Sequence, residues 1–103
     1  MTVQEYMDRS GIPVKAKGYE ILKKMIELQI EDSGKYLENI MFHIACDNRM
    51  NNGAMYKSVQ RAIQKGFPVM DKQLREKIFR DEENPTVSGY VRTASYYIRS
   101  GLI

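Results

Sequence analysis

The sequence predicts an all-α protein, a compact bundle of five to six short helices in a single domain over residues 1–103. Apolar residues recur at offsets of three and four through most of the chain, which is the period of amphipathic helices. No segment alternates apolar and polar residues as a strand does, and clusters of Gly, Pro, Asn and Asp interrupt the pattern at short intervals. With 103 residues, 43% of them hydrophobic, the chain can bury one modest core.

The N-terminal region predicts a short helix followed by a connector. Thr2 and Glu5 have the spacing of a capping box, and the apolar residues after Thr2 form a small patch on one helical face. Residues 11–19 contain a proline and two glycines, which disfavour a long helix. This stretch therefore predicts a connector that offers Ile12 and Val14 to the core.

Two helices with broad apolar faces follow the connector. The first spans about residues 18–30 and the second about residues 35–46, and the polar residues between them include Asp32 and Gly34, which break the helical pattern. The residues that these two helices are predicted to bury are Ile21, Leu22, Met25, Ile26, Leu28, Leu37, Ile40, Met41, Ile44 and Ala45.

The second half of the chain predicts a turn and three more helices. Residues 47–53, DNRMNNG, are a dense turn signal, and the helix over 53–67 after it is expected to stop at Gly66. Asp71 can cap a fifth helix, and Thr86 lies at the start of the last one. The predicted inward residues of these helices are Met55, Val59, Ala62, Ile63, Leu74, Ile78, Phe79, Val87, Tyr90, Val91, Ala94 and Ile98.

The positive charge of the chain is concentrated in one segment. The formal net charge is only +3, but residues 48–70 contain four basic residues, Arg49, Lys57, Arg61 and Lys65, and no Asp or Glu. The rest of the chain has twelve basic and thirteen acidic residues. An uneven field of this kind steers anionic partners toward the positive segment.

The helix over 53–67 has two contrasting faces. Its apolar anchor residues share one face, and the opposite face carries a stripe of Lys57, Gln60, Arg61 and Gln64. These side chains can donate to base edges and phosphates in the major groove of duplex DNA. The alternative interpretation is an ordinary solvated outer face.

The composition predicts a cytoplasmic protein. The single cysteine excludes an intramolecular disulfide, which suits a reducing compartment. The N-terminus lacks the regions of a signal peptide, and no stretch has the roughly 20 apolar residues that span a bilayer. We therefore expect no contact with a membrane.

Groups for catalysis or metal binding are sparse, so the sequence predicts that the protein is not an enzyme and needs no cofactor. His43 and Cys46 lie three residues apart on a predicted core helix, but a structural zinc site normally takes four ligands, and the chain has no second His or Cys. We expect a partly buried His and a small apolar Cys. Three tyrosines at helical spacing, Tyr90, Tyr96 and Tyr97, could stack on bases or on a partner but are assigned to core or boundary packing.

Several ordered motifs resemble one family. These are GIPVKAKGYEIL over 11–22, the Ile44–Ala45 pair, VQRAI over 59–63 and PTVS over 85–88. Together they resemble the C-terminal DNA-binding domain of the stage-zero sporulation response regulator of endospore-forming Firmicutes, a sporulation transcription factor. The resemblance implies an all-helical fold with a helix-turn-helix, in which a recognition helix at about 54–65 enters DNA as part of a dimer on tandem sites. It also places Arg61 where the family has a DNA-contacting arginine.

The chain departs from that family in several places, one of which is a shorter segment between the helix over 53–67 and the last helix. The turn at 47–53 is longer, and Gln60, Gln64 and Lys65 stand where the family uses charged residues toward bases. Glutamine can pair with the edge of adenine, so a changed target sequence is expected.

The sequence therefore predicts a sequence-specific transcriptional regulator that binds double-stranded DNA, with possible homodimerisation. Lys57, Gln60, Arg61 and Gln64 are predicted to face the groove, with Lys65 and Arg49 on phosphates. The alternative is a protein-interaction module that keeps the helix-turn-helix shape and turns its basic face to an acidic partner.

Overall fold

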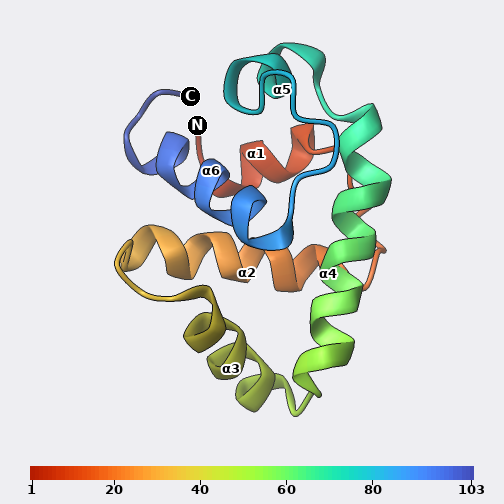
Figure 1. Ribbon diagram of the computed structural model, residues 1–103, viewed down its shortest axis with the longest axis vertical. Helices are drawn as coiled ribbons and strands as arrows, with labels where there is room; N and C mark the ends of the chain where they lie inside the picture. The colour runs from red at the N-terminus through yellow and green to blue at the C-terminus, as the bar shows by residue number, and fades with distance from the viewer.

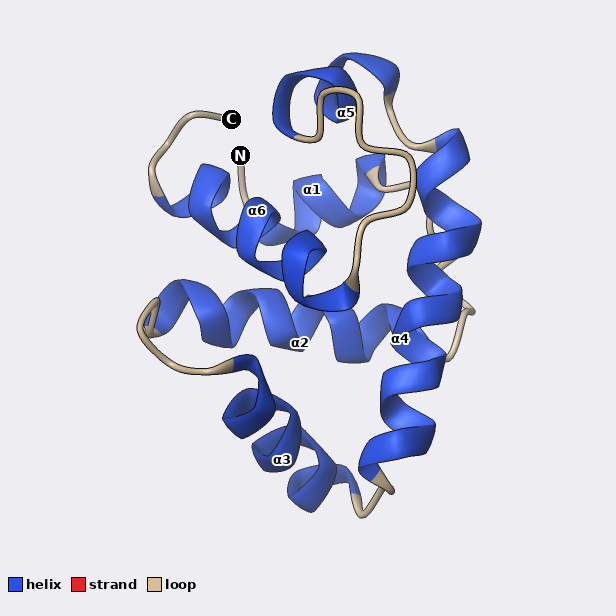
Figure 2. Cartoon of the chain, viewed as in Figure 1, coloured by secondary structure: helices blue, strands red, loops and turns tan.

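One helix, α2, lies at the centre of the core. The computed structural model describes all residues, 1–103, and contains six α-helices and no strand (Figures 1 and 2). The predicted all-α bundle of five to six helices is confirmed. No helix has both the length and the apolar character that crossing a bilayer requires. In chain order the elements are α1 (Val3–Arg9), α2 (Gly18–Glu31), α3 (Leu37–Asn48), α4 (Asn52–Gly66), the 3₁₀ turn η1 (Phe67–Val69), α5 (Lys72–Ile78) and α6 (Val87–Arg99).

α2 contacts α1, α3, α4 and α6. In Figure 1 it crosses the middle of the molecule, with α1 and α6 on one side, α3 on the other and α4 across its N-terminal end. Leu22, Met25 and Ile26 are completely buried there, and each such side chain contributes about 1.5–3 kcal/mol by leaving water. Of the inward residues predicted on the helices, all are buried except Leu28 and Ile98, which are half-buried against the same core.

Capping residues fix the predicted starts of three helices. The Thr2 hydroxyl accepts from the Glu5 amide at 3.1 Å, and the Glu5 carboxylate accepts from the Thr2 amide at 3.0 Å, which completes the capping box of α1. The carboxylate of Asp71 accepts from the Leu74 amide at 2.9 Å, which caps α5. The hydroxyl of Thr86 accepts from a backbone amide in the first turn of α6 at 3.0 Å, which caps that helix. These three starts are therefore encoded locally.

Two details around the connector differ from the prediction. Val14 is exposed, so only Ile12 of the pair enters the core. Gly66 is not a left-handed stop but the last residue of α4, with an ordinary φ of −82°, and the chain continues into η1. The reason is packing, because a Cβ atom on Gly66 would collide with Ile12 and lie 2.9 Å from the carbonyl oxygen of Ser10. Glycine is needed here for close approach and not for its backbone freedom.

Four aromatic rings join the N-terminal and C-terminal parts of the core. Tyr6 and Tyr90 meet edge to face at 6.2 Å between ring centres, Tyr90 stacks on Phe79 at 5.1 Å, and Phe79 meets Phe67 at 5.2 Å. Neither tyrosine hydroxyl has a hydrogen-bond partner. Burial raises the pKa of Tyr90 to about 12 and raises the pKa of Tyr6 well above its usual value.

Alkaline pH is expected to destabilise the protein through these two tyrosines. The unfolded chain releases the phenolic protons near pH 10.0, whereas the folded chain holds that of Tyr90 up to about 12. The stabilisation is complete below pH 10.0 and is lost as the pH rises through about 12. Urea unfolding at about pH 9 and about pH 11.5 measures the loss, which the double change Tyr6→Phe and Tyr90→Phe should reduce by roughly 4 kcal/mol, about 2 kcal/mol for each tyrosine. The exposed Tyr36→Phe is the control, and an unchanged loss in the double variant would contradict the assignment.

Candidate nucleic-acid interface

One face of α4 is buried and the other is free. Its apolar residues pack into the core, whereas the five side chains singled out from the sequence all lie in solvent. None of the five makes a side-chain hydrogen bond or an ion pair within the protein, so their N–H donors remain available. A helical surface that offers Lys, Arg and Gln donors without a carboxylate can bind phosphate oxygens and the acceptor atoms of base edges. The five residues are Lys57, Gln60, Arg61, Gln64 and Lys65.

The turn before α4 is short, contrary to the predicted longer turn at 47–53. α3 continues to Asn48, whose side-chain amide donates to the Ile44 carbonyl at 2.8 Å, and α4 begins at Asn52. Only three residues, 49–51, connect the two helices. That is the connection length of a helix-turn-helix. The Asn-rich stretch therefore supplies helix ends and not a long loop.

Both ends of this connection are capped. Arg49 has a left-handed φ of 52°, and the amide of Met50 donates to the Ala45 carbonyl at 2.9 Å, as in a Schellman motif. The left-handed conformation costs a non-glycine residue about 1–2 kcal/mol. At the other end the side-chain oxygen of Asn51 accepts from the amides of Gly53 and Ala54 at 2.8 and 3.2 Å. The direction in which α4 leaves α3 is therefore fixed by local hydrogen bonds.

The predicted site residues do not form one cluster. Arg61, Gln64 and Lys65 line a hollow beside α4, whereas Gln60 lines a hollow on the opposite flank, which Gln64 also borders. Lys57 lines neither hollow. Arg49 lies in the turn that precedes α4, roughly 20 Å along the helix from Lys65 at 1.5 Å per residue. The predicted residues thus follow the length of α4 and do not converge on a point.

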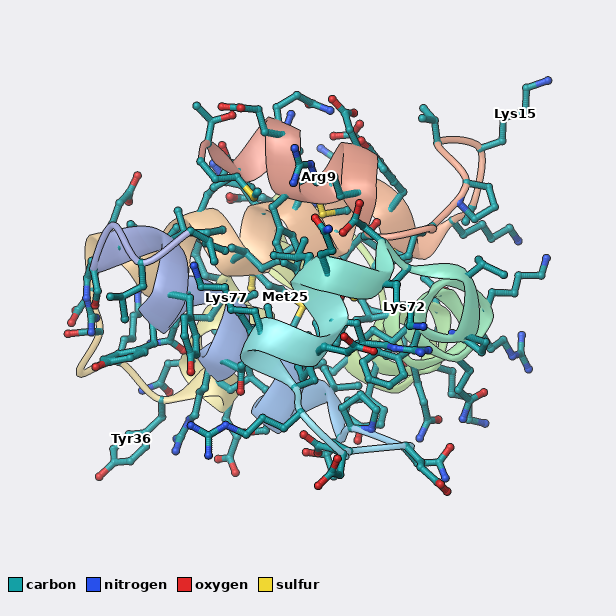
Figure 3. The ribbon with its side chains drawn as sticks, turned by 90° about the horizontal axis from the view of Figure 1, so that it is seen from above. Arg9, Lys15, Met25, Tyr36, Lys72 and Lys77 are labelled. Atoms are coloured by element: carbon teal, nitrogen blue, oxygen red, sulfur yellow. The ribbon has the colours of Figure 1, made fainter.

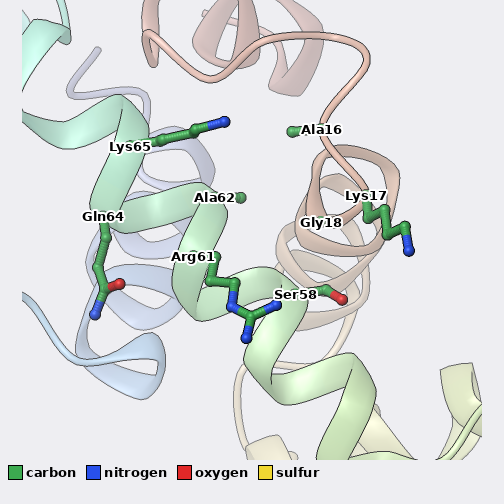
Figure 4. A pocket seen from close by; sticks show the side chains of 8 residues that line it. All are labelled: Ala16, Lys17, Gly18, Ser58, Arg61, Ala62, Gln64 and Lys65. Atoms are coloured by element: carbon green, nitrogen blue, oxygen red, sulfur yellow. The ribbon is translucent and has the colours of Figure 1, made fainter.

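The hollow that Arg61 and Lys65 border is lined by basic side chains. It has a volume of about 450 Å³ and lies between α4 and the residues that lead into α2 (Figure 4). Figure 4 shows Lys65 pointing across it toward Ala16, and Lys17 on the connector side with its side chain directed away from Arg61. Its eight lining residues include three cations and no carboxylate. Three cations around an open hollow suit a phosphate group.

Lys17 is the residue that the sequence interpretation missed. It is separated from Arg61 by more than forty positions, and the two border one hollow only because α2 packs on α4. The two lysines of the connector were the only sign in the sequence that this segment contributes positive charge. Only Lys17 lines the hollow, whereas Lys15 extends into solvent (Figure 3).

Gly18 sets the distance between the connector and α4. A Cβ atom at this position would lie 2.8 Å from the carbonyl carbon of Ser58 and 2.9 Å from the Cβ of Ala62, and nearer still to the Ser58 carbonyl oxygen. Real Cβ atoms essentially never come this close, so a larger residue must push α2 away from α4. Lys17 borders the same hollow as Arg61 because position 18, which has no side chain, allows the connector to approach α4 closely.

The opposite flank of α4 has a different charge. The hollow there has a volume of about 240 Å³ and is lined by Gln60 and Tyr56 of α4 and by the loop before α6, which contributes Glu83. A phosphate backbone is repelled by this carboxylate and attracted by the cations around Lys17. The electrostatics therefore favour an anionic strand on the connector side.

The other groups considered from the sequence do not form a site. His43 and Cys46 are both exposed on α3, contrary to the expected burial, because they lie on the side of the helix that faces away from α2. The imidazole of His43 lies 3.3 Å from the carboxylate of Asp47. No group of three potential metal ligands is present. Of the three tyrosines assigned to packing, Tyr90 is buried, Tyr97 is half-buried and Tyr96 is exposed.

No protein-family model, no curated protein and no solved structure matches the chain. The resemblance to the sporulation regulator family therefore stays a prediction from the motifs.

Gly18→Ala is expected to destabilise the fold and to disturb the hollow together. Because overpacking of this kind costs about 1–3 kcal/mol, the midpoint of urea unfolding should fall accordingly. Gly34→Ala is the matched control, since a Cβ atom there would find only the Asp32 carboxylate at 3.7 Å. Equal midpoints for the two variants would show that the contact is not tight.

Asn51→Ala should lower the free energy of unfolding by about 1 kcal/mol because the first amides of α4 lose their cap. The neighbouring Asn52→Ala removes an exposed amide that makes no side-chain hydrogen bond and should change stability by less than about 0.5 kcal/mol. A thermal unfolding series measures both. If Asn52→Ala proved the more damaging change, the start assigned to α4 would be wrong.

Proposed function

We propose that the chain is a DNA-binding domain of the sporulation-regulator effector type and acts as a transcriptional regulator in the cytoplasm. The observation that carries the proposal is the exposed face of α4, which has free Lys, Arg and Gln donors, no carboxylate, and a cationic hollow along one edge. In this proposal α4 is the recognition helix and α3 supports it. The three-residue connection between them supports the helix-turn-helix interpretation.

The length of α4 agrees with its proposed place in the major groove. The groove is about 12 Å wide, and Arg49 and Lys65 are separated by roughly 20 Å along the helix. Side chains at the two ends can therefore contact the phosphates on either side while the middle of the helix faces the bases. We assign Arg49 to one backbone, and Lys65 with Lys17 to the other.

The middle of α4 supplies the base-reading groups in this proposal. Arg61 suits guanine, because its guanidinium can donate two hydrogen bonds to the major-groove edge, and Gln60 and Gln64 suit adenine. Lys57 completes the stripe as a donor to either a base or a phosphate. The family resemblance adds the expectation of a homodimer on tandem sites, in which a second copy repeats these contacts.

The salt dependence of duplex binding tests the proposal. With about six phosphate contacts, affinity for a pool of random duplexes should fall roughly a thousandfold between 50 and 200 mM salt. Lys17→Ala and Lys65→Ala should each reduce the slope of log Kd against log salt by about one. Gln60→Ala should leave that slope unchanged and relax base preference in a selection of bound sites from a random library.

Arg61→Ala and Lys57→Ala should weaken duplex binding by about 1–3 kcal/mol, or five- to 150-fold. Lys77→Ala is the matched control; it removes an equal charge from α5, and its side chain lies on the part of that helix farther from α4 (Figure 3). Undiminished binding in both α4 variants would remove the site. Absence of any duplex binding at micromolar protein in low salt would favour an acidic protein partner for the same face.

A further inference from the structure

A second groove follows the exposed side of α6, on residues that the proposed DNA site does not use. Two adjoining hollows form it, with volumes of about 260 and 550 Å³, and Tyr36 and Arg92 border both. One wall is a stripe of α6 with the spacing of successive helical turns, from Ser88 through Arg92 to Arg99. The other wall is the loop before α3 with the first turns of that helix.

The basic side chains of this groove have no ion-pair or hydrogen-bond partners within the protein. Lys35, Arg92 and Arg99 line it, and none of them makes an ion pair or a side-chain hydrogen bond in the protein. The guanidinium of Arg99 lies 5.9 Å from the ring centre of Tyr96, which leaves its N–H groups free. Glu38 is the only carboxylate on the walls. Three free cations against one carboxylate favour an acidic ligand.

The groove also exposes aromatic side chains to solvent. Tyr36, Tyr96 and Tyr56 are 69%, 51% and 38% exposed, and Figure 3 shows the ring of Tyr36 projecting outward. Between Tyr36 and Tyr56 the groove is lined by the aliphatic side chains of Leu37 and Met41. Exposed Tyr and Arg around an aliphatic floor is the composition of protein-binding hot spots.

A buried acceptor without a partner lies at the cationic end. Gln29 is only 4% exposed, and its Nε2 donates to the carbonyls of Asp32 and Lys35 at 3.1 and 3.2 Å, which orients the side chain. Its Oε1 receives no hydrogen bond. An unpaired buried acceptor of this kind is costly.

We propose that this groove binds a short acidic segment of a partner protein, with one or two apolar anchor side chains between its carboxylates. The carboxylates pair with Arg92, Arg99 and Lys35, and the anchor rests on the floor between Tyr36 and Tyr56. The eleven-residue step from Ser88 to Arg99 spans about 16 Å, which corresponds to about five residues of an extended segment. Glu38 and the aliphatic floor favour a peptide over a nucleic acid strand.

A random 12-residue peptide library displayed on phage and selected against the full chain tests this proposal. Selected peptides should be rich in Asp and Glu around Leu, Met or aromatic residues. For a synthetic selected peptide, Arg92→Glu and Tyr36→Ala should each weaken Kd about tenfold or more. Lys77→Glu makes the same charge change on α5 and should alter Kd by less than about twofold. Amide NMR spectra verify that each variant remains folded.

Several results would overturn the proposal. These are no enrichment of peptides, equal selection by the Arg92→Glu variant, or peptides whose NMR shifts map to Lys57, Arg61 and Lys65 of α4 and not to Tyr56. Tighter binding of a 12-nucleotide oligothymidine with the same variant losses would assign the groove to single-stranded nucleic acid. A dimer in sedimentation that Arg92→Glu abolishes would assign it to a second copy of the chain.

The test is independent of the proposed DNA function. Duplex binding should be equal in Arg92→Glu and Lys77→Glu, because neither residue lies on α4. A chain that binds no duplex but selects acidic peptides through Arg92 would retain this inference, and the reverse result would retain only the DNA site.

Discussion

The contact between the first turn of α2 and the middle of α4 is the constraint on which the functional surface depends. α2 carries α1, α3 and α6 as well, so the absence of a side chain at Gly18 fixes the position of α4 relative to the whole core. Since α4 buries one face in that contact, its opposite face must point to solvent. The same contact brings Lys17 to the hollow that Arg61 borders, so one small residue affects both packing and the local charge.

The helices were predictable from the sequence because their burial follows a local period. The side chains that cap α1 and α5 act within three residues, which is also readable in sequence. The connection at 49–51 was not, since Asn and Asp favour turns by propensity, and here Asn48 bonds back to the helix instead. The left-handed Arg49 has no signal in sequence, as arginine has no preference for that conformation.

The candidate site likewise has a part that the local sequence pattern predicts and a part that it does not. Exposure of Lys57, Arg61 and Gln64 follows from the period of α4 alone. The hollow that Arg61 shares with Lys17, and the acidic flank at Glu83, are tertiary relationships between distant segments and have no local pattern. The groove along α6 was not predicted, because tyrosines at helical spacing were assigned to packing. Tyr96 instead lies in solvent beside unpaired arginines.

α4 is held at both ends before any ligand arrives. Asn51 caps its first turn, and Ile12 packs against Gly66 at its last. A helix fixed in this way loses little conformational entropy on binding, so association should lack the large negative heat-capacity change that accompanies coupled folding. Any change in heat capacity would then report only the area in contact with the partner. Calorimetry of this chain would therefore measure the interface itself, without a contribution from ordering the helix.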